Sequence, residues 1–339
     1  MRIGLVSFAH THAAQYARAL SAMPGVELIG FTDDDDQRAA DAQAQFGLQR
    51  FPDDDALLSA GPDGIVVCTE NNRHRGPVEK AAAAGVGVLC EKPLATNASD
   101  ALAMVQACER AGVSLMTAFP MRFNGPLTAL RELIRSGRAG QVRICEGVNQ
   151  GQLPRRHREW FVDPVLAGGG ALTDHTVHLA DVLRWVLDSE VVEVYAQTNQ
   201  LLQSSDIVVE TGGLVGLGFD NGVLATIDCS WSRPDSYPTW GGVGLRVMTD
   251  NGAFNADAFG QTITCYDDTA AGASWLSYGG DDNAAMLAEF IAALRERRPA
   301  SPDGTDGYRA VQIVQAAYRS AATGRPVPTE FAIRQAADV

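Results

Sequence analysis

The chain has 339 residues, which is long for a single domain and indicates two. Its net charge of −14 argues against nucleic acid or an anionic membrane surface as the main partner. No apolar run approaches the ~20 residues of a membrane span, and the start shows no signal-peptide pattern. The six cysteines form no C-x-x-C pair. We therefore expect a cytoplasmic protein whose cysteines are reduced thiols.

The N-terminal half alternates short apolar strands with helices of about a dozen residues, which is typical of βαβ units in a parallel sheet. The strands are apolar without alternation, as expected when both faces of a sheet are covered. The expected strands are residues 3–6, 26–31, 63–69, 86–89 and 113–118, and the expected helices are 11–22, 37–46, one ending at 81–84, and 97–111.

The turn after the first strand is where a dinucleotide-binding G-x-G-x-x-G fingerprint would lie, but all three glycines are missing. Ala9 replaces the middle glycine, the least disruptive change, and the following helix N-terminus still favours an anion. The candidate cofactor-binding residues of this turn are Ser7, Phe8, Ala9, His10, Thr11 and His12. His10 and His12 also have H-x-H spacing, yet no carboxylate or cysteine is near them in sequence, so no metal is expected here.

Asp33 ends the second strand, 21 residues after His12, close to the spacing of a carboxylate that binds the adenosine ribose. The neighbouring Asp34 would repel a 2′-phosphate, so NAD is expected in preference to NADP. The alternative is a solvated acidic turn over residues 33–36 with one helix cap.

Lys92 follows the fourth strand and precedes Pro93, which biases the lysine towards an extended backbone. Ligands bind outside the carboxyl ends of the strands of an open α/β sheet, so Lys92 is well placed to contact a substrate. The alternative is an ordinary surface lysine before a turn.

The second half changes pattern to longer strand-like runs over residues 191–202, 207–219, 223–231 and 244–248, with a hairpin turn at 220–222. We expect a mostly antiparallel α+β domain with late helices at 283–295 and 307–322. The expected domains are therefore residues 1–120 and 121–339. The basic cluster at 155–158, which includes Arg156, is a candidate for an acidic substrate group or, alternatively, a solvated loop.

A glycine run, Gly168 to Gly170, leads into a predicted helix that carries Asp174 and His178 on one face, with Asp181 beyond them. A carboxylate beside an imidazole forms an acid–base pair. The alternatives are that Asp174 caps the helix while His178 is a core histidine, or that Asp174, His175 and His178 bind a metal; we expect no metal.

These motifs together resemble the glucose-fructose oxidoreductase/inositol dehydrogenase/rhizopine catabolism (Gfo/Idh/MocA) family over residues 1 to about 325. The resemblance is carried by Glu91-Lys92-Pro93, the 68–74 strand exit, Arg122-Phe123, the 168–178 stretch and Asp306 to Ala310. It implies a doubly wound Rossmann domain followed by an α/β domain whose open sheet mediates dimers or tetramers. Glu70 stands where the family usually has proline, and the glycine fingerprint is absent.

The resemblance also implies NAD(P)-dependent oxidation or reduction of a sugar, inositol or related polyol. Lys92, Asp174 and His178 match the family's catalytic lysine, aspartate and histidine, and Asp33 its ribose-binding acid. Further expected cofactor contacts are Thr69, Asn71, His74 and Glu91, and further substrate contacts are Arg122, Arg156 and His175. The open alternatives are a non-oxidising NAD-binding sensor, an NAD-dependent glycosidase or lyase with transient oxidation, and a metal-dependent isomerase.

Overall fold

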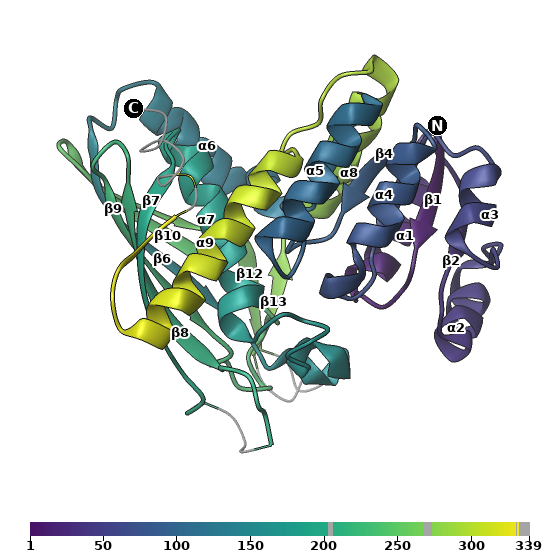
Figure 1. Cartoon of the computed structure of the whole chain (residues 1–339). Helices are drawn as coiled ribbons and strands as arrows, with labels where there is room; N and C mark the ends of the chain where they lie inside the picture. Colours follow the sequence, from purple (N-terminus) through teal and green to yellow (C-terminus); the bar gives the residue numbers. More distant parts are fainter. Residues whose placement is uncertain (203–205, 267–272, 330, 332–339) are drawn as a thin grey trace. The chain divides into compact units, whose positions relative to one another are not determined.

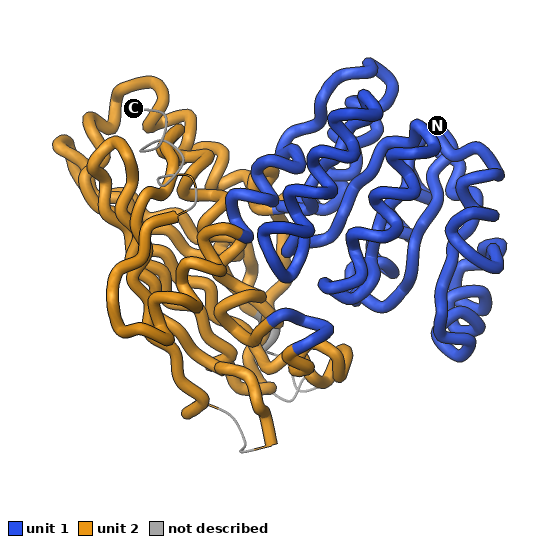
Figure 2. The backbone as a smooth tube through the Cα atoms, in the orientation of Figure 1, with its two compact units in different colours: residues 1–120, 165–168, 281–311 blue, residues 121–164, 169–280, 312–339 orange. Residues whose placement is uncertain are grey.

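The structure is a computed structural model that describes residues 1–202, 206–266, 273–329 and 331 (Figure 1). The chain divides into two compact units (Figure 2). Unit 1 comprises residues 1–120, 165–168 and 281–311, and unit 2 comprises 121–164, 169–280 and 312–339. The first boundary falls after Pro120; the return of residues 165–168 and 281–311 to unit 1 was not anticipated from the sequence.

Unit 1 is built on a five-stranded sheet with the order β2-β1-β3-β4-β5, all of whose recorded pairings are parallel. The expected parallel sheet is confirmed, and β3, β4 and β5 are buried along their whole length. The strands are β1 (Arg2–Val6), β2 (Glu27–Thr32), β3 (Gly64–Val67), β4 (Gly87–Cys90) and β5 (Leu115–Thr117).

Several helices of unit 1 begin at a polar side chain that caps them. Asp35, Asp53 and Asn97 each accept a main-chain N–H from the first turn of the helix that follows, as N-cap residues do. The helices are α1 (His12–Ala22), α2 (Asp36–Phe46), α3 (Asp54–Ser59), α4 (Arg75–Ala83), α5 (Ala98–Ala111) and α8 (Asp282–Glu296), with a 3₁₀ turn at Asn71–Arg73.

Helix α8 packs directly on the sheet although it lies almost 200 residues further along the chain than β4. A Cβ atom added at Gly64 of β3 or Gly87 of β4 would lie 2.6 or 2.4 Å from the side chain of Leu294. These two glycines therefore let the helix approach the strands closely.

Unit 2 is built on a seven-stranded sheet with the order β11-β10-β6-β9-β8-β7-β14 and a separate β12-β13 hairpin. Among the described residues of this unit the strand pairings are antiparallel, except the β6–β9 pair, which is parallel. The strands are β6 (Val142–Gln150), β7 (Val191–Asn199), β8 (Gly212–Phe219), β9 (Leu224–Ser230), β10 (Val243–Thr249), β11 (Gly252–Asp257), β12 (Thr262–Tyr266), β13 (Ala273–Ser277) and β14 (Val327–Pro328). The mostly antiparallel second sheet is confirmed, including the hairpin at 220–222.

Helices α6 (Gly125–Arg135), α7 (Ala171–Leu187) and the later turns of α9 (Gly304–Thr323) lie on one face of this sheet (Figure 1). The core between them is apolar, and Leu179 and Leu183 of α7 are fully buried in it. Each such leucine contributes about 1.5–3 kcal/mol. Short 3₁₀ turns complete the unit at Pro120–Phe123, Pro154–Arg156 and Glu159–Val162.

Strand β6 was not predicted, because its hydrophobic pattern is inverted. Ile144 and Val148 are 44% and 39% exposed, whereas Cys145, Gly147 and Asn149 face the helices. Small residues are needed on the covered face, since a Cβ at Gly147 would lie 2.9 Å from Leu179. The apolar side chains therefore lie on the uncovered face of the sheet.

Candidate functional site

The turn after β1 has the tight shape of a dinucleotide-binding turn without its glycines. Ser7, at the position of the first glycine, has φ 67°, the left-handed conformation that glycine adopts most easily. Its hydroxyl accepts the Ala9 N–H at 3.0 Å, which offsets part of the cost of that conformation. The turn is tied to β2 and to the exit of β3, because the Ser7 and His10 N–H groups donate to the carbonyls of Thr32 and Cys68.

Asp33 organises this turn from the end of β2. Its carboxylate accepts the Phe8 N–H at 2.7 Å, the Ser7 hydroxyl at 3.2 Å and the Asp35 N–H at 2.9 Å. Arg38 donates to both carboxylate oxygens at 2.9 Å. The side chain of Asp33 is 0% exposed, so its oxygens are committed to the protein.

A cavity of about 330 Å³ opens at the carboxyl ends of β1, β2 and β3, where an open α/β sheet binds ligands. Its lining is acidic, with the carboxylates of Asp33, Asp34, Asp53, Asp54 and Glu70. Arg73, which also lines it, forms ion pairs with Asp34 at 2.7 Å and with Glu70 at 3.4 Å. The size suits part of a dinucleotide, and the excess of carboxylates disfavours an extra phosphate.

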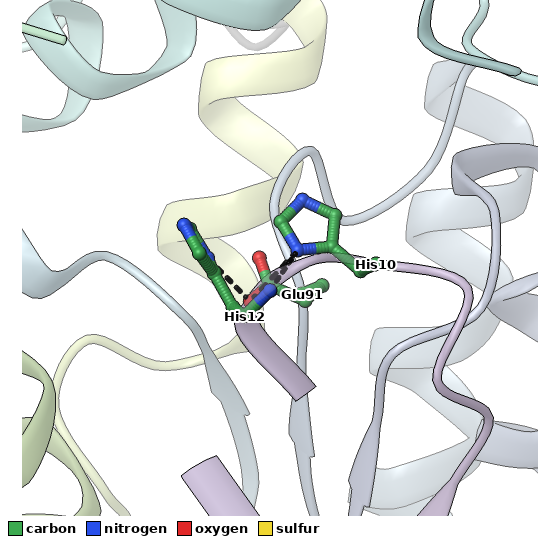
Figure 3. Close-up of side chains that lie close together, drawn as sticks. All are labelled: His10, His12 and Glu91. Atoms are coloured by element: carbon green, nitrogen blue, oxygen red, sulfur yellow. Dashed lines mark hydrogen bonds and ion pairs between the residues drawn. The ribbon is translucent and has the colours of Figure 1, made fainter. Parts of the chain in front are cut away.

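Glu91 follows β4 and carries a fully buried carboxylate between two imidazoles (Figure 3). Its Oε1 lies 3.0 Å from His12 Nδ1 and 3.7 Å from His10 Nδ1 and accepts the Tyr16 hydroxyl at 2.6 Å. Burial by itself raises the pKa of Glu91, but the charges of His10 and His12 and the hydrogen bonds from His12 and Tyr16 outweigh it and hold the pKa well below its usual range. Glu91 is therefore an anion that the turn encloses.

Lys92 is the next residue, and its main chain is held on both sides. Its N–H donates to Glu91 Oε2 at 3.0 Å, and the Lys92–Pro93 peptide bond is cis. The side chain is buried rather than on the surface, which rules out the ordinary surface lysine considered from the sequence.

His74 lies behind this segment. Its Nδ1 faces the carbonyls of Pro93 and Leu94 at 3.1 and 3.2 Å, and its Nε2 faces that of Thr69 at 3.3 Å. Burial lowers the pKa of His74 although hydrogen bonds to these carbonyls oppose the shift. Because the ring is 0% exposed, it links the exits of β3 and β4 from within.

Asn71 and Thr69 occupy the exit of β3 itself. Asn71 Nδ2 donates to the Ala167 carbonyl at 2.9 Å, so it holds the 165–168 segment of unit 1. The Thr69 hydroxyl donates to the Glu70 carbonyl at 3.2 Å. Thr69 also lines the acidic cavity.

In unit 2, the start of α7 is capped by a residue from a distant segment. Glu210 Oε1 accepts the N–H groups of Gly170 and Leu172 at 2.8 and 3.0 Å and the Tyr318 hydroxyl at 2.7 Å. The N-cap position is Gly170, so the alternative that Asp174 caps the helix is wrong. Sequence reasoning missed Glu210 and Tyr318 because neither is near α7 in the chain.

The glycines before α7 let two distant segments of the chain, those of Tyr318 and Glu210, approach the start of the helix closely. A Cβ at Gly169 would lie 1.8 Å from Tyr318 Oη, and one at Gly170 would lie 2.1 Å from the Glu210 carbonyl. Gly169 has φ 147°, outside the range of most side-chain-bearing residues. The close approach expected at these glycines is thus made by the chain's own atoms.

Asp174 is buried and positioned by Trp231 of the segment after β9. Trp231 Nε1 donates to Asp174 Oδ2 at 3.2 Å, and His175 Nε2 lies 3.3 Å from the same oxygen. His178 lies one turn further along α7 and is half-buried. The structure therefore supplies a fixed carboxylate and an imidazole on one helix, and Trp231 is the contact that the sequence did not reveal.

Two arginines expected to contact substrate are paired with carboxylates. Arg122 binds Asp181 through two hydrogen bonds of 2.8 and 2.6 Å, and both side chains are buried. Arg156 forms an exposed ion pair with Asp235. These pairs neutralise both guanidinium charges in this structure.

Comparison with known proteins agrees with both units. Residues 1–119 match the family described as an oxidoreductase family with an NAD-binding Rossmann fold, and residues 127–255 match the GFO/IDH/MocA C-terminal domain. No helix within the described ranges is long and apolar enough to cross a membrane.

The relatives are similar to this chain over nearly their whole length. The chain is 30% identical to a 1,5-anhydro-D-fructose reductase of Ensifer adhaerens, with 97% of this chain and 98% of the relative covered. It is 26% identical to a myo-inositol 2-dehydrogenase of Thermotoga maritima, with 98% and 100% covered. The crystal structure of GenD2 from gentamicin A biosynthesis in complex with NAD superposes with a TM-score of 0.88 at 27% identity, covering 97% of this chain and 96% of that one. The chain therefore belongs to the Gfo/Idh/MocA oxidoreductase family and carries its NAD-binding Rossmann domain.

Proposed function

We propose that this oxidoreductase moves a hydride between NAD and a secondary hydroxyl or ketone carbon of a sugar, an inositol or a related polyol. The observation that carries the proposal is a buried lysine, Lys92, at the carboxyl end of β4 in the NAD-binding domain. The names of the relatives, a reductase of an anhydro-sugar and a dehydrogenase of myo-inositol, support this substrate class.

NAD, when bound, supplies the hydride acceptor for alcohol oxidation. The acidic cavity at the ends of β1 to β3 is proposed to hold its adenosine half, with the carboxylates of Asp33 and Asp34 facing the ribose. Asp34 is the more available of the two, since its side chain is 65% exposed. The main chain of Ser7 to His12 would hold the phosphates, and Thr69 would border the adenosine half from the wall of the cavity. Asn71 and Glu91 would support the nicotinamide side, with His74 positioning Lys92 and Pro93 from behind.

The chain's own groups manage the proton and the charge. His178 takes the hydroxyl proton as a general base, a contribution of typically ~10²–10⁴-fold in rate. Lys92 donates a hydrogen bond to the same oxygen and stabilises its developing negative charge. Asp174, fixed by Trp231, orients the substrate and balances the charge of Lys92, while His175, Arg122 and Arg156 are proposed to complete the substrate site.

The test is a panel of inositols, sugars and sugar acids, with NADH absorbance as the signal and NAD compared with NADP. We expect NADH formation with at least one polyol and a preference for NAD. With the alcohol and cofactor that give turnover, His178→Gln should lower kcat by ~10²–10⁴-fold. His157→Gln, at an exposed histidine to which the proposal assigns no role, should leave kcat unchanged. Equal kcat for the two variants would refute the role of His178.

One observation favours a second candidate, a non-oxidising NAD-binding sensor. The carboxylate expected to bind the ribose, Asp33, is enclosed by Arg38, Phe8 and Ser7, and the fingerprint glycines are absent. A sensor would give heat on NAD injection in a calorimeter but no NADH with any alcohol of the panel.

We also propose that the protein is a cytoplasmic homodimer or homotetramer assembled through the uncovered face of the unit 2 sheet. That face exposes large apolar side chains, namely Ile144, Val148, Tyr195, Leu214 and Leu224, and exposed apolar patches mark interaction surfaces. The five cysteines whose side chains are described are buried and unpaired, which suits a reducing compartment. Leu214→Glu should shift the mass measured by light scattering towards that of the monomer, and an unchanged mass would contradict the interface. Cell fractionation tests the location: recovery of the native protein outside the cytoplasmic fraction would contradict it.

A further inference from the structure

Three side chains with metal-binding donor atoms converge in the turn that lacks the glycines. His10 and His12 come from the turn between β1 and α1, and Glu91 comes from the residue after β4, 79 positions beyond His12. One donor atom from each lies within 4.8 Å of the others. Figure 3 shows both rings directed at the same carboxylate, one from either side.

The two distances that involve Glu91 are close to those of a tetrahedral site, and the donor atoms of the two imidazoles lie within 4.8 Å of each other. Tetrahedral coordination with bonds of ~2.0–2.1 Å places neighbouring ligand atoms about 3.3 Å apart. Glu91 Oε1 lies 3.0 Å from His12 Nδ1 and 3.7 Å from His10 Nδ1, which brackets that value. The three residues all belong to unit 1, so no movement between the units is involved.

The surroundings also suit a metal ligand set. The main-chain N–H of His12 donates to His10 Nδ1 at 3.2 Å, so that nitrogen acts as an acceptor in this contact. A metal would take the same lone pair in place of this long hydrogen bond. Two donors outside the ligand set orient the carboxylate, namely the Tyr16 hydroxyl at 2.6 Å from Oε1 and the Lys92 main-chain N–H at 3.0 Å from Oε2.

Burial adds a reason for a cation. The side chain of Glu91 is 0% exposed and that of His10 is 1% exposed, whereas that of His12 is 15% exposed and offers a route for an ion to enter. A buried carboxylate needs a compensating positive charge, which protonated imidazoles or a metal ion can supply. Two imidazoles and one carboxylate are the donor set of three-ligand metal sites that keep one position open.

We propose that His10, His12 and Glu91 form a binding site for one divalent transition-metal ion of the zinc class, with an open position for a water molecule or another exogenous ligand. This site differs from the expectation of no metal, which rested on the absence of a carboxylate near the histidines in sequence. The proposal is independent of the proposed function, because metal binding is measured on the cofactor-free protein and hydride transfer on the panel described above.

The experiment uses the full chain after dialysis against a chelator. Co²⁺ is titrated in and followed by visible absorption, and Zn²⁺ is then titrated by calorimetry and by competition with a chromogenic chelator. We expect one ion per chain, an intense tetrahedral-type cobalt spectrum and release of protons on binding. His12→Gln and Glu91→Gln should each weaken Zn²⁺ binding by at least about 100-fold.

The matched control is His157→Gln, which removes an imidazole elsewhere and should leave Zn²⁺ affinity unchanged. Circular dichroism of each variant separates lost binding from lost folding, and His12→Gln is the safer of the two because His12 is the most exposed member of the cluster. Absence of stoichiometric Zn²⁺ binding in the wild type, or binding that folded His12→Gln retains in full, would overturn the site and leave protonated imidazoles as the counter-charge of Glu91.

Discussion

Replacing Glu210 by alanine tests whether the start of α7 is held from outside the helix. In the structure one oxygen of Glu210 accepts the N–H groups of Gly170 and Leu172 and the hydroxyl of Tyr318. Alanine would leave two main-chain donors of the first turn without their acceptor and remove a negative charge from the helix N-terminus. The helix carries Asp174 and His178, so the substitution perturbs stability and the proposed site together.

The expected cost follows from the bonds lost. Each N–H bond to a charged cap is worth about 1–2 kcal/mol, so two of them give about 2–4 kcal/mol. At ~2.1 cal/mol/K per residue over 339 residues, this corresponds to a fall in Tm of about 3–6 °C if the chain unfolds as one. A larger fall is expected if unit 2 unfolds alone, because its unfolding entropy is smaller.

The assay is differential scanning calorimetry, with kcat measured on whichever polyol is active. Glu210→Gln keeps an acceptor for the two N–H groups and should cost about 1 kcal/mol or less. Glu193→Ala, an exposed glutamate of β7, should change stability by at most about 0.5 kcal/mol. If Glu210→Ala melted within experimental error of Glu193→Ala, the capping account of α7 would be refuted.

Other substitutions give separate expectations. Gly169→Ala should lower the free energy of unfolding by several kcal/mol, because the added Cβ would lie 1.8 Å from a tyrosine hydroxyl. Gly137→Ala, at a glycine with φ 75° and nothing within 4 Å, should lower it by only about 1 kcal/mol. Chemical denaturation compares the two variants, and equal losses would contradict the steric argument. The buried His74 has a lowered pKa, so below pH ~6.5 the unfolded chain binds more protons than the folded one. The free energy of unfolding should therefore fall as the pH drops beneath that value, by up to about 1.4 kcal/mol per pH unit. His74→Gln should reduce this slope in denaturation curves measured from neutral pH downwards, and an unaltered slope would refute the role of His74. Arg122→Ala leaves the Asp181 carboxylate buried without its bidentate partner and should lower the free energy of unfolding by about 3–5 kcal/mol in chemical denaturation. Asp181→Asn removes the buried charge and should lower it by less; an equal or larger loss would contradict the buried charge as the cause.

The parallel sheet of unit 1 was predictable because its strands are short and apolar and alternate with helices. Strand β6 was not, because Ile144 and Val148 lie on the uncovered face and the covered face needs small residues. Helix α8 was predictable as a helix, but its place on the sheet of unit 1 depends on the close approach of Leu294 to Gly64 and Gly87, which no local pattern encodes.

In the candidate site, too, some features could be predicted from the sequence and others could not. Lys92, Asp174 and His178 stand in motifs that can be read locally, next to a proline or at helical spacing. Contacts from far along the chain hold the segments that carry these residues. Glu210 lies 40 residues from Gly170, and Glu91 lies 79 residues from His12. Sequence periodicity reports which face a residue occupies and does not report which distant segment packs on it.

Lys92 is proposed to act on an alcohol oxygen in an NAD-dependent oxidation. The most direct measurement compares the wild type with Lys92→Ala on the polyol panel, with turnover followed by NADH absorbance and NAD affinity measured by calorimetry. We predict that the wild type forms NADH and that the variant binds NAD with similar affinity but loses ~10²–10⁴-fold in kcat. Wild-type turnover by a folded Lys92→Ala, or no heat when NAD is injected into the wild type, would contradict the account.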